Sequence, residues 1–142
     1  MTSNNKVVEL EETKISVKVK LSALWVTIML LYIYADILSL FKPGQVGKML
    51  DGFMGPFPAT QASLLTAAIM MIIPAVMVFL SLALKSKINR WVNLVTGILY
   101  MLVSISNMIG ETWAYYLLFG AVEIVCALLI ISYAWKWPKL ED

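Results

Sequence analysis

Apolar residues gather in four long stretches that fill most of the 142-residue chain. The stretches run over residues 21–41, 61–84, 91–109 and 114–135. A helix needs about 20 apolar residues to cross the ~30 Å hydrocarbon core of a bilayer, and each stretch is long enough. The pattern therefore predicts an all-α fold, a four-helix transmembrane bundle, in a multi-pass membrane protein.

The long connection between the first two stretches carries a second helical pattern. Apolar side chains recur there at helical spacing, at positions 46, 49, 50, 53 and 57. We expect a short amphipathic helix that lies flat in the membrane interface or, alternatively, covers a pocket. Residues 85–90 and 110–113 are predicted to be tight turns, so the second, third and fourth spans should be antiparallel neighbours.

The basic residues are divided unequally between the two sides of such a bundle. With a cytoplasmic N-terminus, nine of the 11 lysines and arginines lie inside, and only Lys42 and Lys48 lie outside. The positive-inside rule therefore predicts that both termini are cytoplasmic. Just before the first span, Lys18 and Lys20 are expected to reach the lipid head groups.

The composition leaves no room for a separate soluble domain. Hydrophobic residues make up 61% and charged residues 14% of the chain, whereas soluble proteins average about 45–50% and 25%. We divide the chain into a polar cytoplasmic tail (residues 1–14), one transmembrane domain (residues 15–138) and a second cytoplasmic tail (residues 139–142).

Missing residue types exclude several kinds of chemistry. The chain has no histidine, which excludes bis-histidine haem, histidine-ligated zinc and histidine acid–base catalysis. Its single cysteine, Cys126, lies within a span and is expected to pack in the core. No basic cluster resembles a nucleic-acid footprint. We therefore predict no cofactor, no metal site and no nucleic-acid partner.

The second span contains Pro74, which should bend it near the middle of the membrane. Proline lacks a backbone donor, so the carbonyl of Met70, four residues earlier, loses its helical partner. Because backbone groups in lipid cannot stay unpaired, we expect a neighbouring side chain or a water to bond this carbonyl.

Polar and small side chains recur on one face of three spans. These faces comprise Tyr32, Asp36 and Ser39 in the first span, Asn93, Gly97, Tyr100, Ser104 and Asn107 in the third, and Tyr116, Gly120, Glu123 and Ala127 in the fourth. Charges that face lipid are costly, so we expect these faces to turn inward. The aliphatic face of the third span, with Leu99 and Leu102, should meet lipid.

The two intramembrane acids are predicted to lie at similar depth. At 1.5 Å per residue, Asp36 and Glu123 differ by only about 5–6 Å along the membrane normal. The predicted ligand-binding residues are Tyr32, Asp36, Asn107 and Glu123, with Gln61, Tyr100, Ser104, Glu111 and Tyr116 at the pocket rim. Either one acid is protonated, or both share a proton, or a ligand cation or water lies between them.

Several segments resemble one uncharacterised bacterial family of four-span proteins, domain of unknown function 6326. The matching segments are residues 32–38, 41–44, 89–93, 115–124 and 133–138, within a resemblance that covers residues 18–138. Many members carry an acid before the proline of the second span, whereas residues 70–74 here contain none. The resemblance implies a four-helix layout similar to DoxX-like proteins, a bacterial inner (cytoplasmic) membrane location and no established activity.

Two functions remain open at this point. The favoured one is binding of a small molecule, cation or lipid in an outward-facing intramembrane pocket, with transport as an extension. The alternative is a non-catalytic subunit or scaffold, whose polar faces hold helices, or the protomers of a homo-oligomer, together. A membrane enzyme that uses Asp36 and Glu123 as an acid–base pair is the least favoured.

Overall fold

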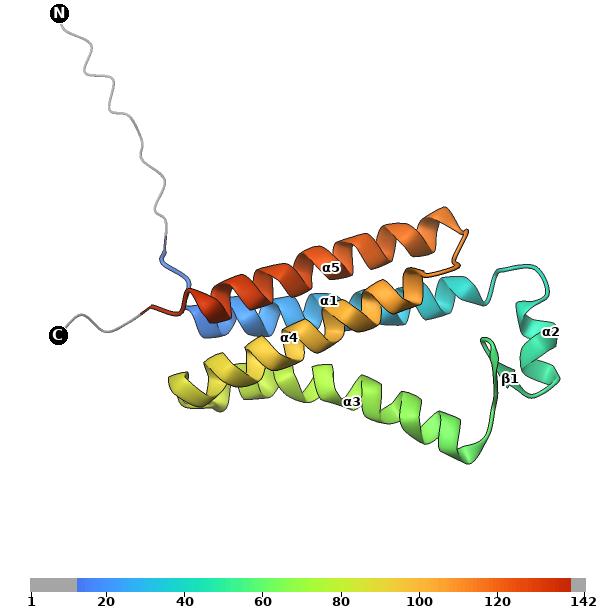
Figure 1. Cartoon of the computed structure of the whole chain (residues 1–142), viewed down its shortest axis with the longest axis horizontal. Helices are drawn as coiled ribbons and strands as arrows, with labels where there is room; N and C mark the ends of the chain where they lie inside the picture. The colour runs from blue at the N-terminus through green and yellow to red at the C-terminus, as the bar shows by residue number, and fades with distance from the viewer. Residues whose placement is uncertain (1–12, 139–142) are drawn as a thin grey trace, which may run out of the picture.

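The computed structural model describes residues 13–138, and four long helices dominate it (Figure 1). The elements are α1 (Val17–Ser39), α2 (Gln45–Leu50), β1 (Phe53–Met54), β2 (Phe57–Pro58), α3 (Gln61–Ala83), α4 (Ser86–Met108) and α5 (Ala114–Trp135). Helices α1, α3, α4 and α5 have 22 or 23 residues each and are apolar enough to cross a membrane. The predicted all-α, four-helix transmembrane fold is confirmed.

The four spans form an elongated bundle with two distinct ends. Helix α1 packs against both α3 and α5, and α5 packs along α4, whereas α3 contacts α4 over only a short part of its length. Residues 13 and 138 lie at one end, which we call the terminal end (Figure 1). Helix α2 and the β1–β2 hairpin lie at the other, which we call the hairpin end.

Two helices begin earlier than their hydrophobic stretches. Helix α1 begins at Val17, because the Ser16 side chain caps it by accepting a hydrogen bond from the backbone N–H of Val19 at 3.4 Å. Helix α4 begins at Ser86, so most of the turn predicted at residues 85–90 is helical instead. Basic residues obscured this start, because hydrophobicity detects the membrane-buried length of a helix and not its polar first turn.

The amphipathic helix predicted as far as Phe57 is only partly correct. Helix α2 ends at Leu50, and a short antiparallel hairpin follows, in which Phe53 pairs with Pro58. Gly52 and Gly55 have φ angles of 84° and 59°. This left-handed conformation breaks a right-handed helix and favours glycine. Local glycine geometry therefore overrides the apolar periodicity here.

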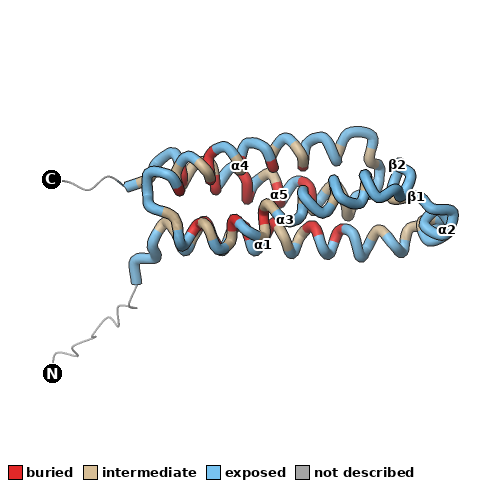
Figure 2. Tube along the Cα trace, turned by 90° about the horizontal axis from the view of Figure 1, so that it is seen from below, coloured by how far each residue is buried: buried red, intermediate tan, exposed pale blue. Residues whose placement is uncertain are grey.

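The core lies between the inward faces of α1, α4 and α5 and the terminal half of α3 (Figure 2). Its largest members are Trp25 and Tyr100, whose rings meet edge to face at 5.6 Å. Cys126 is buried in this core, as expected. The inward faces predicted for α4 and α5 are confirmed over most of their length, since Gly97 and Gly120 are buried and Leu99 is exposed, but Asn107 at the end of α4 is exposed.

A buried polar network joins three helices near the terminal end. The indole N–H of Trp25 and the hydroxyl of Ser81 both donate to Asn93 Oδ1, at 2.8 and 3.2 Å. The amide of Asn93 donates to Asn89 Oδ1 at 2.6 Å, and the amide of Asn89 donates to the carbonyl of Ser81 at 2.6 Å. Because buried polar groups need partners, this network determines how α1, α3 and α4 meet.

Lys18, which was expected to reach the lipid head groups, bonds the end of a neighbouring helix. Its ammonium donates to the carbonyls of Leu84 and Leu82, at 2.7 and 3.2 Å. These carbonyls belong to the C-terminal end of α3, where helical acceptors lack partners and a positive charge is favourable. Lys18 therefore holds the end of α3 against the start of α1.

Candidate functional site

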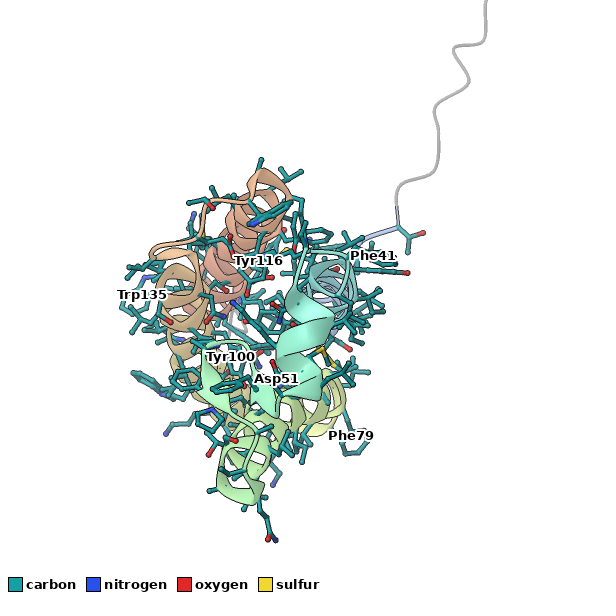
Figure 3. All side chains as sticks on the ribbon, turned by 90° about the vertical axis from the view of Figure 1, so that its right-hand side faces the viewer. Phe41, Asp51, Phe79, Tyr100, Tyr116 and Trp135 are labelled. Carbon is teal, nitrogen blue, oxygen red and sulfur yellow. The ribbon has the colours of Figure 1, made fainter. Side chains whose placement is uncertain are left out.

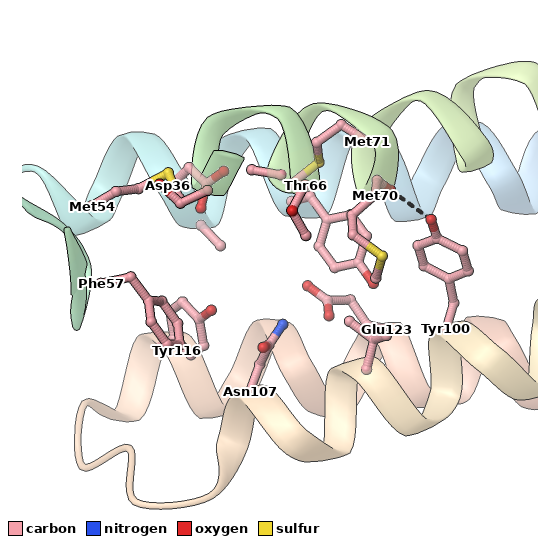
Figure 4. A pocket seen from close by; sticks show the side chains of 15 residues that line it. Asp36, Met54, Phe57, Thr66, Met70, Met71, Tyr100, Asn107, Tyr116 and Glu123 are labelled. Carbon is pink, nitrogen blue, oxygen red and sulfur yellow. Dashed lines mark hydrogen bonds between the residues drawn. The ribbon is translucent and has the colours of Figure 1, made fainter. Parts of the chain in front are cut away.

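A pocket of about 500 Å³ opens in the half of the bundle nearer the hairpin end. All four spans and the hairpin contribute side chains to it (Figure 4). Six of its lining residues belong to the predicted site, namely Tyr32, Asp36, Tyr100, Asn107, Tyr116 and Glu123. The pocket thus brings together side chains that lie up to 91 positions apart, from 32 to 123.

The base of the pocket lies at the proline of α3. The Tyr100 hydroxyl donates to the carbonyl of Met70 at 2.5 Å, which is the group that Pro74 leaves without a helical partner (Figure 4). This confirms the prediction that a neighbouring side chain bonds this carbonyl. Beyond this bond α3 diverges from α4 towards the hairpin end (Figure 1), which leaves room for the pocket.

Glu123 enters the pocket from α5 and is 5% exposed. The Ser104 hydroxyl donates to Glu123 Oε2 at 2.8 Å, and Tyr32 Oη lies 3.4 Å from Ser104 Oγ. Ser104 has a single hydrogen, which it gives to Glu123, so the Tyr32 hydroxyl is the donor to Ser104. A hydrogen-bonded chain from α1 through α4 to α5 therefore orients the carboxylate of Glu123.

Asp36 enters the pocket from α1, one turn beyond Tyr32. Within residues 13–138 its carboxylate forms no hydrogen bond and no ion pair, because Ser39 donates to its backbone carbonyl, at 2.6 Å, rather than to the side chain. The residue lines the pocket, which agrees with the expected inward face of the first span, and it is exposed.

Asn107 lies on the last turn of α4 and points into the pocket (Figure 4). Its side chain is exposed, and its amide makes no hydrogen bond with the described part of the chain. The amide therefore offers the pocket two N–H donors and one carbonyl acceptor. Together with the carboxylates of Asp36 and Glu123, it gives the pocket polar groups on three helices.

Three of the predicted rim residues do not line the pocket. Ser104 lies beneath it and supports Glu123, while Gln61 is exposed at the start of α3. Glu111 turns away and accepts a hydrogen bond from Lys42 at 2.8 Å, which lowers the pKa of the Glu111 carboxyl below its usual value. Backbone N–H groups of the α4–α5 turn also bond Glu111, at 2.9 Å each.

Lys42 is held at the hairpin end by partners other than the two pocket acids. Its ammonium lies over the rings of Trp113, Tyr115 and Tyr116, at 5.6, 5.4 and 5.2 Å from their centroids. Cation–π attraction and the ion pair with Glu111 both hold it there. Lys42–Glu111 is the one ion pair formed between described residues, so no lysine or arginine among them pairs with Asp36 or Glu123.

Sequence reasoning missed the face of α3 that closes the pocket. Ser63, Thr66, Ala67 and Met70 line it at i, i+3, i+4 and i+7, a helical face of small, polar and flexible side chains. This helical spacing was the signal in the sequence that could have identified the pocket-facing side of α3. The hairpin adds Met54 and Phe57, of which only Phe57 belonged to the apolar face of the predicted amphipathic segment.

The described residues contain no group of three or more cysteine, aspartate or glutamate side chains that could hold a metal ion. No curated protein and no solved structure matches this chain. The family model of DUF6326 matches residues 5–142, which agrees with the resemblance seen in the sequence segments. The chain therefore belongs to DUF6326, a family of unknown function.

Proposed function

We propose that this integral membrane protein binds a small molecule or lipid that carries a cationic or hydrogen-bond-donating group. The observation that carries this proposal is the pair of acids, Asp36 and Glu123, in one pocket at membrane depth without a cationic partner among the described residues. Intramembrane acids are rare and costly, and they mark ligand or ion sites more often than surface acids do.

The polar groups define one end of the ligand. Glu123 uses one carboxylate oxygen to accept from Ser104, which leaves its other oxygen available to a ligand donor. Asp36 supplies a second carboxylate, and Asn107 supplies an amide. An ammonium, amidine or polyhydroxyl group can bond all three, and a cation also neutralises the acids.

The remaining lining defines an apolar part of the ligand. Met54, Met70 and Met71 offer flexible, polarisable side chains, and Phe57 adds an aromatic ring. A volume of about 500 Å³ lies within the ~300–1,000 Å³ range of pockets that bind drug-sized molecules. The proposed ligand is therefore amphipathic rather than a bare metal ion.

The proposed orientation places the pocket on the outer side of a bacterial cytoplasmic membrane. The positive-inside rule supports this sidedness, and the resemblance to the bacterial family supports the location. Transport would also require a path to the terminal end. The buried side chains of Trp25 and Tyr100 lie across that path in this structure, so we propose binding as the primary activity.

Ligand-induced stabilisation of the purified protein in detergent tests the proposal. A panel of amines, amidines and neutral sugars is added to the parent protein and to the variants Glu123→Gln, Asp36→Asn and Glu111→Gln, and unfolding temperature is measured. Cationic members should raise the unfolding temperature of the parent by mass action. Both pocket variants should lose this response, because each removes one of the charges that bind the cation.

Glu111→Gln is the matched control, because Glu111 is an acid near the pocket that does not line it. It should respond to cations like the parent. Should Glu123→Gln and Asp36→Asn fold like the parent and respond equally to every compound, the pocket acids are not a binding site. The scaffold alternative would then account for the inward polar faces.

A further inference from the structure

We infer that the ligand is a chain-bearing amphiphile whose tail lies between α3 and α4 and reaches the lipid, so that it enters from the membrane. This inference rests on the proposed function, because it assigns the ligand's polar head to Asp36 and Glu123. It adds the class of ligand and its route, which the polar groups alone do not determine.

The hydrogen bonds that the described residues form between α3 and α4 end at the base of the pocket. Near the terminal end, Asn89 and Asn93 of α4 bond Ser81 of α3. At the base of the pocket, Tyr100 of α4 bonds Met70 of α3. The described residues form no hydrogen bond between the two helices nearer the hairpin end than this last one. The buried residues of α3 are Pro74, Met77 and Ser81, all on the terminal side of Met70.

The side chains that flank this separation both line the pocket and reach the bundle surface. Met71 on α3 is 43% exposed and Thr66 is also exposed, while Val103 on α4 is half-buried. Figure 4 shows α3 and α4 on opposite sides of the pocket. A residue that lines a pocket and also lies on the surface marks where the pocket opens.

This opening lies at the depth of the hydrocarbon. At 1.5 Å per residue, Met71 is about 15 Å from the start of α3 at Gln61, and Val103 is about 7–8 Å from the end of α4 at Met108. A helix of 23 residues is about 34 Å long, so Met71 lies near the middle of the membrane. Lipid chains, and not water, meet the opening there.

The hairpin end of the pocket is partly covered, although Phe57, which is 63% exposed, and Asn107 also line the pocket and reach the surface there. Helix α2 and the hairpin lie across the hairpin end of the bundle (Figure 3). Met54 and Phe57 of the hairpin line the pocket on this side, and Lys42 joins the end of α1 to the α4–α5 turn through Glu111. Because apolar chains are more stable in lipid than in water, an apolar tail is better accommodated between α3 and α4 than towards the hairpin end.

The inference is tested by adding dodecylamine or butylamine to the protein purified in the detergent dodecyl maltoside. The two amines share a head group and differ in chain length. Dodecylamine should bind the parent at least tenfold more tightly than butylamine, measured as ligand-dependent unfolding temperature. Val103→Trp fills the opening and should weaken dodecylamine binding at least tenfold. Leu102→Trp adds the same ring to the neighbouring, 56% exposed position and should leave binding unchanged.

A second matched pair repeats the test on α3 in case Val103→Trp does not fold. Met71→Trp fills the opening from the other side, and Ile72→Trp is its control at a 57% exposed position. Equal binding of both amines, with both blocking variants like their controls, would overturn the lateral inference. If Glu123→Gln abolished the binding of both amines, the proposed function would still hold. If neither amine stabilised the parent, both the proposed function and the inference would fail.

Discussion

At the scale of single residues, a few hydrogen bonds connect helix geometry to the pocket. Pro74 leaves the carbonyl of Met70 free, and Tyr100 bonds this carbonyl from α4. The same Tyr100 ring packs against Trp25 in the core and also lines the pocket. One side chain thus supports the bend of α3 and closes the base of the candidate site.

We expect Tyr100→Phe to destabilise the protein by about 1–3 kcal/mol, because it leaves a partly buried carbonyl unpaired. In a Pro74→Ala background the backbone N–H of residue 74 can bond Met70 instead, so the same change should have a smaller effect. Unfolding in detergent of the parent, both single variants and the double variant measures this coupling. Strictly additive effects would contradict the pairing of Tyr100 with the proline-freed carbonyl.

The Lys42–Glu111 ion pair should make stability depend on pH. The hydrogen bond from Lys42 lowers the pKa of Glu111 in the folded protein below its ordinary value of 4.5. A group with a lowered folded pKa stabilises the fold above its unfolded pKa, and this contribution is lost as the pH falls through the folded pKa. The parent should therefore exceed Glu111→Gln in unfolding temperature near neutral pH, and the difference should shrink below about pH 4.

Lys42→Met provides the control for this measurement, because it removes the other partner of the pair. In that background Glu111→Gln should lose most of its pH-dependent effect. A difference between parent and Glu111→Gln that stays constant from neutral to acidic pH would show that the ion pair does not contribute to stability.

At the scale of elements, close approach of α4 and α5 depends on small residues. A Cβ atom at Gly97 would lie 3.1 Å from side-chain atoms of Ile130 and Ile131, closer than ordinary van der Waals contact. Small residues let membrane helices pack closely, which compensates for the weak hydrophobic driving force in lipid. The predicted inward face of α4 thus has a packing role as well as a polar one.

We expect Gly97→Leu to lower the yield of folded protein strongly, since its side chain would have to displace α5. Leu99→Ile, on the exposed face of the same helix, should be mild. Size-exclusion profiles and unfolding temperatures in detergent compare the two variants. Equal loss of folded protein from both would mean that Gly97 does not face α5.

At the scale of the whole molecule, the bundle is asymmetric along its length. The terminal end is closed by the core and by the asparagine network of α4, whereas the hairpin end contains the pocket. If this asymmetry follows the positive-inside orientation, the pocket faces outward and the closed end faces the cytoplasm.

Cysteine labelling in intact cells tests this orientation. In a Cys126→Ala background, Asp51→Cys near α2 should react with an impermeant thiol reagent from outside, because position 51 is exposed. Lys87→Cys, also exposed, should react only after the cells are permeabilised. The opposite labelling pattern would reverse the sidedness and would place the pocket at the cytoplasmic surface.

The sequence by itself determined the four spans, most of the inward polar positions and the fate of the Met70 carbonyl. Each of these follows from local physics: span length from hydrophobicity, faces from the helical period, and the freed carbonyl from proline four residues later. The two acids could also be placed at similar depth by counting residues along their helices.

Only the tertiary structure decided how these parts meet. It paired Glu111 with Lys42, placed Ser104 beneath Glu123, and replaced the end of an expected helix with a hairpin that contributes Phe57 to the pocket. It also kept α3 apart from α4 beyond Met70, although the two helices are consecutive. Such contacts depend on the packing of segments distant in the chain, which the pattern along any one segment does not specify.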